Sequence, residues 1–200
     1  MAEQIGGIHN LGPYTPYSEK ENRIVFPGQD GGVNYGGVSI DPALGYVFVN
    51  TIDLGGMGIL VKKNGGYDLS SPVQGRRFWD PANQMPCQPG PWAHLTAVNA
   101  NTGEIAWKVV LGSMDELEAK GVHNTGAYGQ GGSIATAGGL VFIGATVDKR
   151  FRAFDSRSGK VLWETRLPGE ARSIPMTYMG SDGKQYVAIS SSGLSVFALE

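Results

Sequence analysis

Apolar residues occur along the chain in short runs separated by glycine-rich turns, a pattern typical of β-strands. The runs from Phe151 onward predict strands at 151–154, 161–167, 175–178, 185–189 and 194–199. Two earlier runs, Tyr46–Val49 and Leu140–Ile143, are apolar without alternation, which indicates strands buried on both faces. Sheets packed between other sheets bury strands in this way, so the pattern favours the blades of a propeller over a sandwich with one wet face.

Three other stretches have different patterns. Residues 1–35 are rich in Gly, Pro, Tyr and Asn and contain one strand-like run at Ile24–Phe26. Residues 52–95 contain glycine clusters and five prolines, and we interpret them as long surface loops of the kind that carries function or contacts a partner. Ser113–Glu116 has the Ser-x-x-Glu form of a capping box and predicts a short helix over about Met114–Lys120.

One eleven-residue motif, here called the tryptophan motif, occurs at Ala97–Trp107 and at Ala153–Trp163. Both copies have the form A-x-[DN]-x-x-x-G-[EK]-x-x-W. This spacing predicts a hairpin in which one strand ends at the Asp or Asn, a glycine with positive φ makes the turn, and the next strand carries the tryptophan. A single hairpin is marginally stable, so a repeated one implies stacked neighbours. We expect Trp107 and Trp163 to be structural, with rings between blades and indole N–H groups bonded to backbone carbonyls.

A second repeat predicts the size of each blade. Gly-Gly followed by a strand, a turn and a strand occurs at Gly36–Thr51 and at Gly131–Thr146. With the tryptophan motif it completes a four-stranded blade of about 40–50 residues, so 200 residues supply about four blades. We therefore predict an all-β fold, a partial β-propeller in which residues 1–200 form a single segment. A small complete propeller is the alternative.

Composition excludes several classes of function. Glycine, at 31 of 200 residues, is about twice its usual share of roughly 7% and favours turns over helices. A net charge of −2 gives no electrostatic basis for binding nucleic acid. No apolar stretch approaches the roughly 20 residues of a membrane span, and the start of the chain has no signal-peptide pattern. The three histidines share no metal-ligand spacing, and Cys87 is the only cysteine.

The tryptophan motif and its surroundings resemble the C-terminal part of the quinoprotein dehydrogenases, eight-bladed propellers that use pyrroloquinoline quinone (PQQ). Residues 131–163 are similar to that family's C-terminal signature, as are Pro175–Tyr178 and Gly183–Val187. Asn34–Gly37 resembles the family's Asn-Trp-Gly-Gly, with Tyr in place of Trp. Within the family the likeness is nearest to the membrane-bound glucose, quinate and polyol dehydrogenases. The resemblance implies about four of the eight blades.

The resemblance implies cofactor-binding residues at three positions. Asn34 matches an asparagine beside the quinone and its calcium ion, and an amide oxygen is a hard ligand that suits Ca²⁺. Gln130 lies in Gly129–Gly132, which matches a loop whose backbone approaches the cofactor. Asp148 matches an aspartate near the quinone that pairs with an active-site lysine. Each has a structural alternative, namely a turn-forming Asn, an inter-strand turn and a turn-capping Asp.

The implied activity is oxidation of an alcohol, sugar or polyol hydroxyl, with PQQ and Ca²⁺ as cofactors and a membrane quinone or another carrier as electron acceptor. The implied location is the periplasm or the periplasmic face of the inner membrane. No catalytic residue is expected here, because the family's catalytic base, active-site Arg and Lys, and most calcium ligands lie upstream. The chain is therefore expected to need the missing N-terminal part of the propeller and to be inactive alone.

Two points leave the function open at this stage. A Gly- and His-containing loop before the family's last strand has no counterpart, because Ser190–Gly193 leads directly to Leu194, so the substrate is undetermined. A non-catalytic propeller scaffold of the outer-membrane assembly type, which shares the tryptophan motif, is the alternative function. A glycan-binding propeller is the weaker alternative, since no set of aromatic and carboxylate residues recurs in each blade.

Overall fold

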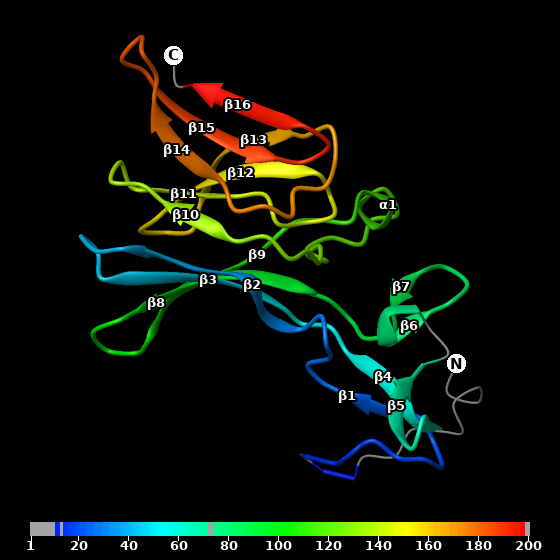
Figure 1. The fold of residues 1–200 in the computed structure, drawn as a ribbon. Helices are drawn as coiled ribbons and strands as arrows, with labels where there is room; N and C mark the ends of the chain where they lie inside the picture. Colours follow the sequence, from blue (N-terminus) through cyan, green and yellow to red (C-terminus); the bar gives the residue numbers. More distant parts are fainter. Residues whose placement is uncertain (1–10, 13, 72–73, 199–200) are drawn as a thin grey trace. The chain divides into compact units, whose positions relative to one another are not determined.

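The structure is a computed structural model that describes residues 11–12, 14–71 and 74–198 as strands, turns and one short α-helix (Figure 1). The chain divides into two compact units. Unit 1 comprises Met1–Gly32 and Asp53–Pro89, and unit 2 comprises Val33–Ile52 and Gly90–Glu200. No helix in the described part is long and apolar enough to cross a membrane. The predicted all-β class is confirmed, whereas the single propeller segment over 1–200 stays a prediction.

Unit 2 consists of three antiparallel sheets whose strands follow one another in chain order (Figure 1). The first sheet contains β2 (Gly32–Asp41), β3 (Tyr46–Ile52), β8 (Ala93–Asn99) and β9 (Ile105–Val110). The second contains β10 (Ser133–Ala135), β11 (Leu140–Ile143), β12 (Arg150–Asp155) and β13 (Val161–Arg166). The third has only β14 (Met176–Met179), β15 (Gln185–Ser190) and β16 (Leu194–Ala198). Stacked meanders of this kind agree with the predicted partial propeller, while the number of blades stays a prediction.

The second sheet is the centre of unit 2, because apolar side chains pack against both of its faces. One cluster joins it to the first sheet and includes Phe48, Ile143 and Phe154. Another joins it to the third sheet and includes Phe142 and Phe151. Consecutive residues of β11 thus enter different clusters, which confirms burial on both faces for this strand.

Strand β3 does not follow the same rule. Its buried residues alternate, at Phe48, Asn50 and Ile52, with half-buried residues between them. The prediction of burial on both faces was therefore wrong for β3. An apolar run shows that both faces of a strand can be buried, but each face is buried only if another sheet packs against it.

Both copies of the tryptophan motif form the predicted hairpins. In the first sheet the third strand ends at Asn99, and in the second sheet it ends at Asp155. The side-chain oxygen of each accepts backbone N–H groups of the turn that follows. Gly103 and Gly159 have φ values of +76° and +71°, a backbone conformation that glycine adopts without strain. The hairpins β8–β9 and β12–β13 also share a register shift just after their Ala residues.

Unit 1 corrects the interpretation of residues 52–95 as long surface loops. Within them β4 (Gly56–Lys63) and β5 (Gly66–Ser70) form a hairpin, and β1 (Arg23–Val25) pairs with β4. The turn is Asn64-Gly65, both with positive φ, which is the strongest short-range hairpin signal in a sequence and was overlooked. The remaining elements of unit 1 are the 3-10 helix η2 (Gln74–Arg76) and the pair β6 (Trp79–Asp80) and β7 (Met85–Pro86).

The predicted capping box was also wrong. Helix α1 spans only Asp115–Glu118, its N-cap is Met114, and no side chain caps it. The Ser113 hydroxyl instead accepts a hydrogen bond from Arg150 Nη1 at 3.2 Å, and the Ser113 backbone N–H donates to Asp148 at 3.1 Å. Tertiary contacts with the second sheet therefore replace the local cap.

Candidate functional site

Strand β2 and the residue that precedes β10 are in contact through two glycines. A Cβ on Gly36 would lie 2.2 Å from the backbone nitrogen of Gly132, so only glycine allows the two backbones to come this close. Asn34 and Gln130 each precede one of these glycines by two residues, and both are half-buried. The structure therefore brings these two predicted site residues to the same region of unit 2.

The Gly129–Gly132 connection is enclosed by protein backbone. A Cβ on Gly129 would lie 1.4 Å from the carbonyl oxygen of Ala145, and one on Gly131 would lie 2.9 Å from that of Ser173. Asn50 Nδ2 donates a hydrogen bond to the Gly131 carbonyl at 2.9 Å. These contacts support the structural alternative for the glycines, and the approach of this backbone to a cofactor stays a prediction.

The side chains beside this contact retain unused hydrogen-bonding groups. Asn34 Oδ1 accepts the backbone N–H of Tyr35 at 2.9 Å, and the Tyr35 hydroxyl donates to the carbonyl of Arg172. The amide nitrogen of Asn34 and the amide group of Gln130 have no hydrogen-bond partner among the described residues. Two half-buried amides with free N–H groups can donate to the carboxylates or carbonyls of a bound ligand.

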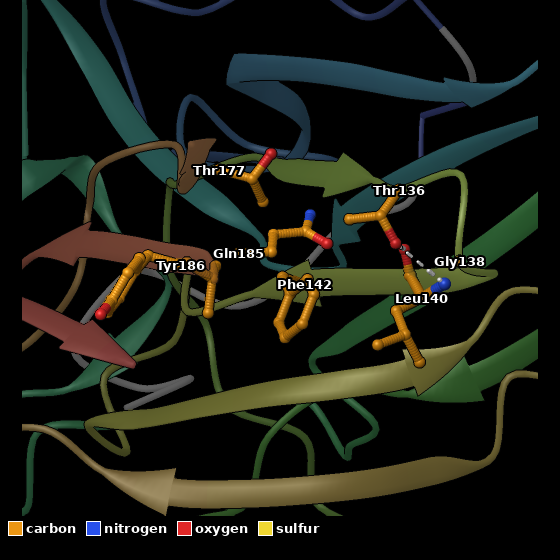
Figure 2. Close-up of a pocket in the computed structure, with 8 residues that line it drawn as sticks. Thr136, Gly138, Leu140, Phe142, Thr177, Gln185 and Tyr186 are labelled. Atoms are coloured by element: carbon orange, nitrogen blue, oxygen red, sulfur yellow. Dashed lines mark hydrogen bonds between the residues drawn. The ribbon is translucent and has the colours of Figure 1, made fainter. Parts of the chain in front are cut away.

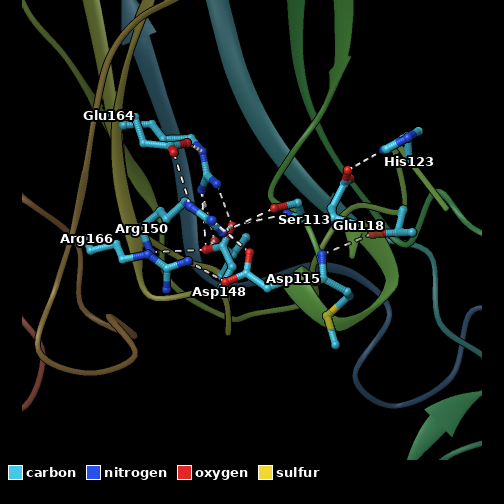
Figure 3. Close-up of polar contacts among 12 residues, drawn as sticks. Ser113, Asp115, Glu118, His123, Asp148, Arg150, Glu164 and Arg166 are labelled. Carbon is cyan, nitrogen blue, oxygen red and sulfur yellow. Dashed lines mark hydrogen bonds and ion pairs between the residues drawn. The ribbon is translucent and has the colours of Figure 1, made fainter. Parts of the chain in front are cut away.

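Asp148 has a different environment from the other two predicted residues (Figure 3). Its side chain is 1% exposed and forms a buried ion pair with Arg152, with 2.5 Å between Oδ2 and Nη2. The Thr146 hydroxyl and the backbone N–H of Arg150 donate to Oδ1, at 2.5 and 3.1 Å. Both carboxylate oxygens are thus engaged within the protein, which is the turn-capping alternative named for this residue. A direct contact with a cofactor stays a prediction.

An ion-pair network extends from Asp148 across the hairpin β12–β13 to helix α1 (Figure 3). Glu164 forms ion pairs with two arginines, through Oε1 with Arg150 Nε at 3.1 Å and through Oε2 with Arg152 Nε at 2.6 Å. Asp115 receives Arg166 at 2.5 Å and Arg150 at 2.7 Å. Hydrogen bonds from Arg166 and then Arg150 hold the pKa of the Asp115 carboxyl below its ordinary value. Sequence reasoning overlooked this network, although cross-strand opposite charges on β12 and β13 were a signal for it.

The described residues do not form a complete metal site. No group of three or more His, Cys, Asp or Glu side chains in 11–12, 14–71 and 74–198 could hold a metal ion. Asn34, the one residue predicted as a calcium ligand, therefore lies beside no cluster of three or more such side chains in that part of the chain. Any Ca²⁺ bound there needs ligands that these residues do not supply.

A separate cavity of about 140 Å³ lies at the other end of β10 and β11 (Figure 2). Leu140, Phe142 and Val187 give it apolar walls. Its polar side chains are those of Thr136, Thr177, Gln185 and Tyr186. The lining contains no Asp, Glu, Lys, Arg or His. This cavity results from the packing of the second and third sheets. Tyr186 is the one ionisable side chain among its lining residues, and its hydroxyl donates to Asp182 Oδ2 at 2.7 Å.

The chain matches the PQQ family described as the β-propeller domain of glucose/ethanol/alcohol dehydrogenases, over residues 1–187. It is 37% identical to the quinate/shikimate dehydrogenase (quinone) of Acinetobacter baylyi, over 85% of this chain and 24% of that protein. It is 35% identical to quinoprotein glucose dehydrogenase A of Acinetobacter calcoaceticus, over 93% of this chain and 26% of that protein. The chain therefore spans about a quarter of the length of these relatives.

A solved structure agrees with this match at the level of the fold. The quinohemoprotein alcohol dehydrogenase from Comamonas testosteroni superimposes with a TM-score of 0.64 and 22% sequence identity. The superposition covers 94% of this chain and 27% of that protein. Identity this low supports the propeller-type fold only.

Proposed function

Because the chain belongs to the PQQ-dependent family of glucose/ethanol/alcohol dehydrogenases, we propose that it forms the C-terminal part of the propeller of a dehydrogenase that oxidises an alcohol, sugar or polyol hydroxyl. The observation that carries this proposal is its 37% identity with a quinate/shikimate dehydrogenase over 85% of the chain. Electrons would pass to a membrane quinone or another carrier, as the name of that relative suggests. The rest of the propeller, with the catalytic base, would come from the longer protein.

The free amides of Asn34 and Gln130 fit the cofactor of this family. PQQ carries carboxylates and quinone carbonyls, and the unused N–H groups of these half-buried side chains are suitable donors to them. When bound, the quinone supplies the two-electron acceptor for the hydroxyl-bearing carbon of the substrate. The role of this chain is to orient the cofactor and to exclude water on one side of it, because the backbones at Gly36 and Gly132 lie in close contact.

Calcium fits less completely. The Asn34 side-chain oxygen is a hard donor that suits Ca²⁺, but it also accepts the Tyr35 N–H. We propose that Asn34 is one ligand and that the longer protein supplies the others. The described residues offer no cluster of three or more His, Cys, Asp or Glu side chains, and Ca²⁺ takes about 6–8 oxygen ligands, so further ligands are needed.

Asp148 is proposed to act through the backbone that it supports. Its connection, Gly144–Lys149, packs against the Gly129–Gly132 connection, and the Val147 N–H donates to the Tyr128 carbonyl at 2.9 Å. The buried Asp148–Arg152 pair fixes the Gly144–Lys149 connection. That connection in turn supports Gly129–Gly132, which contains Gln130. Asp148 is thus a positioning residue in this proposal. The direct contact that the family resemblance implies would be additional.

A location on the periplasmic side of the inner membrane belongs to the same proposal. It is supported by two relatives, a quinate/shikimate dehydrogenase and a quinate dehydrogenase, whose names give quinone as the acceptor, since quinone carriers lie in the membrane. The substrate class is limited to small hydroxyl compounds, because the named relatives act on quinate and glucose.

The proposal is tested by titrating PQQ, with CaCl₂ present, into the purified chain and following the quinone absorption. We expect saturable binding, and Asn34→Ala and Gln130→Ala should each weaken it about tenfold, the value of one charge-assisted hydrogen bond. Gln185→Ala, an amide at the margin of the separate cavity, is the matched control and should bind PQQ normally. Unchanged affinity in both site variants, or no binding by the folded chain, would contradict the assigned residues.

A second measurement tests whether the chain is only part of an enzyme. With PQQ, Ca²⁺ and glucose or ethanol, the isolated chain should reduce no redox dye. Clear turnover by the chain alone would show that the catalytic base lies within these residues and would overturn that part of the proposal.

A further inference from the structure

The cavity between the second and third sheets has one polar side, to which both sheets contribute (Figure 2). Thr177 on β14 pairs with Val187 on β15, and Gln185 is two residues from Val187, so all three lie on one face of their hairpin. Thr136, which follows β10, lines the same space from the second sheet. Figure 2 shows the Gln185 amide pointing into the space between the two threonines. One amide and two hydroxyl groups therefore converge on this side of the cavity.

These polar groups can bind a ligand. The Thr177 hydroxyl and the Gln185 amide make no hydrogen bond with another described residue. Thr136 Oγ1 accepts the backbone N–H of Leu140 and donates to its carbonyl, but both distances are long, at 3.3 Å. Amide and hydroxyl groups both donate and accept hydrogen bonds. Their best complement is a ligand hydroxyl, which also does both.

The opposite side of the cavity is apolar and open. Leu140, Phe142 and Val187 form it, and Phe142 is held in place by the apolar cluster between the two sheets. A Cβ on Gly138 would meet only Thr136 Oγ1, at 3.9 Å, so there is free space beside the turn between β10 and β11. A cavity of about 150 Å³ is large enough for benzene. The 140 Å³ here thus has room for a ligand of about six non-hydrogen atoms.

The charge of the lining limits the ligand to a neutral compound. The described residues that line the cavity include no charged side chain. Asp182 and Lys184 lie in the adjacent turn between β14 and β15, and neither is a lining residue. The Asp182 carboxylate already accepts the Tyr186 hydroxyl at 2.7 Å and the backbone N–H of Lys184 at 3.1 Å. A charged ligand would lose its water here without gaining a partner of opposite charge.

We propose that this cavity is a binding site for a small neutral vicinal diol, with its hydroxyls at Gln185 and Thr177 and its short carbon chain against Phe142. The apolar side disfavours a molecule that carries hydroxyls along its whole length, because one of them would be buried without a partner. The cavity lies at the end of β10 and β11 opposite to the Gly129–Gly132 connection. It is formed by unit 2 alone and is separate from the residues proposed to contact PQQ, so it does not depend on the proposed function.

Three probes with the same number of non-hydrogen atoms test the ligand class, namely 1,2-butanediol, glycerol and butyrate. Each is titrated into the full chain without PQQ and followed by NMR. 1,2-Butanediol should saturably shift the side-chain amide signals of Gln185 and the methyl signals of Leu140 and Val187, with a dissociation constant of about 1–10 mM. Glycerol places a hydroxyl on the apolar side and should bind about fivefold more weakly. Butyrate is charged and should bind at least about tenfold more weakly.

Variants of the chain test the location of the site. Thr177→Val and Gln185→Leu keep the size of the side chain but remove its hydrogen-bonding groups, and each should weaken diol binding about fivefold. Gly138→Leu adds a side chain beside the free space and should weaken binding at least about tenfold. Thr165→Val on β13, a threonine that does not line the cavity, is the matched control and should bind the diol normally. All four variants should unfold at about the same temperature as the parent chain.

Several results would overturn the proposal. These are no saturable shift with any probe, equal affinity for 1,2-butanediol and either of the other probes, and unaltered diol binding by Thr177→Val and Gln185→Leu. The two proposals fail separately, because PQQ is absent from these titrations. Gln185→Ala, the control of the PQQ titration, should lose diol affinity while it binds PQQ normally. A failed PQQ titration therefore leaves the diol site standing, and a failed diol titration leaves the proposed function standing.

Discussion

The hairpins β8–β9 and β12–β13 arise from one sequence motif and have the same backbone conformation, yet their side chains make different contacts with the rest of the protein. Strands β8 and β12 are the third strands of the first and second sheets, and at matching positions β8 has Thr96 where β12 has Arg152. Thr96 is a buried neutral residue, whereas Arg152 forms a buried ion pair with Asp148. Trp107 is capped by a neighbouring turn, whereas Trp163 faces an open groove.

This difference separates two kinds of information in the motif. The turn glycine and the Asn or Asp act locally, so both hairpins form wherever the motif occurs. The energetic value of the remaining side chains depends on the adjacent sheet. Substitutions at matched positions of the two hairpins should therefore have unequal effects, and the predictions below are ordered from the largest expected effect to the smallest.

The largest inequality is expected between Arg152 and Thr96. Arg152→Met leaves the carboxylate of Asp148, which is 1% exposed, without its main partner and should cost about 3–5 kcal/mol in the free energy of unfolding. Thr96→Val removes a hydroxyl at the matching position and should cost less than about 1 kcal/mol. Urea denaturation of both variants measures this directly. A cost near zero for Arg152→Met would mean that the network of Figure 3 contributes no stability.

The turn glycines give the next comparison. Gly103→Ala and Gly159→Ala both force a Cβ into a positive-φ conformation, which costs about 1–2 kcal/mol. A Cβ at Gly103 meets nothing within 4 Å, whereas one at Gly159 meets the Trp107 ring at 2.6 Å, so Gly159→Ala should cost a further 1–3 kcal/mol or so. Thermal and urea denaturation of the two variants check this order. Equal losses would show that the contact between the second-sheet turn and Trp107 is loose.

The tryptophans themselves should differ by less. Trp107→Phe loses the hydrogen bond to Ser156 and part of the ring contact with Gly159, for about 1–2 kcal/mol. Trp163→Phe retains an aromatic ring against Phe151 and Phe197 and should cost under about 0.5 kcal/mol in the isolated chain. Urea denaturation of the two variants measures this difference, and a large cost for Trp163→Phe would mean that its indole N–H is already bonded.

The smallest expected effect is a pH dependence that only one hairpin has. Hydrogen bonds from the Ser158 hydroxyl and backbone N–H lower the pKa of Asp155 from its ordinary 3.8. Its stabilising contribution is therefore complete above that value and is lost as the pH falls through the lowered pKa, whereas Asn99 in the other hairpin does not titrate. Asp155→Asn should consequently be less stable than the parent chain near neutral pH, with the gap closing in acid. A gap that stayed the same size as the pH fell into strong acid would contradict this sign.

The sequence predicted the local parts of the fold well. Strands β12 to β16, both tryptophan hairpins and the structural role of Trp107 follow from short-range patterns, and the structure confirms them. The hairpin β4–β5 was just as local, since Asn64-Gly65 specifies its turn, and only the surrounding glycines and prolines obscured it. The capping box at Ser113 failed for the opposite reason, because a distant arginine competes for the serine hydroxyl.

The candidate site was predictable in part. The family resemblance singled out Asn34 and Gln130, and the structure brings both near one contact between sheets, while cofactor binding by them stays a prediction. Nothing in the residues around Asp148 predicted that its carboxylate is enclosed by Arg152, Thr146 and the backbone of Ser113. Cofactor binding by Asn34 and Gln130 is a prediction that the PQQ titration tests.

By itself, the sequence determined which segments become strands, where the turns fall and which family the chain belongs to, because these depend on residues close together in the chain and on the order in which the motifs occur. Only the tertiary structure decided that Gly36 meets Gly132, that Asn50 bonds to Gly131 from 81 positions away, and that Trp107 is capped while Trp163 faces a groove. The physical reason is that these contacts arise when separate sheets stack. The residues of a repeated motif do not determine which sheet packs against each copy.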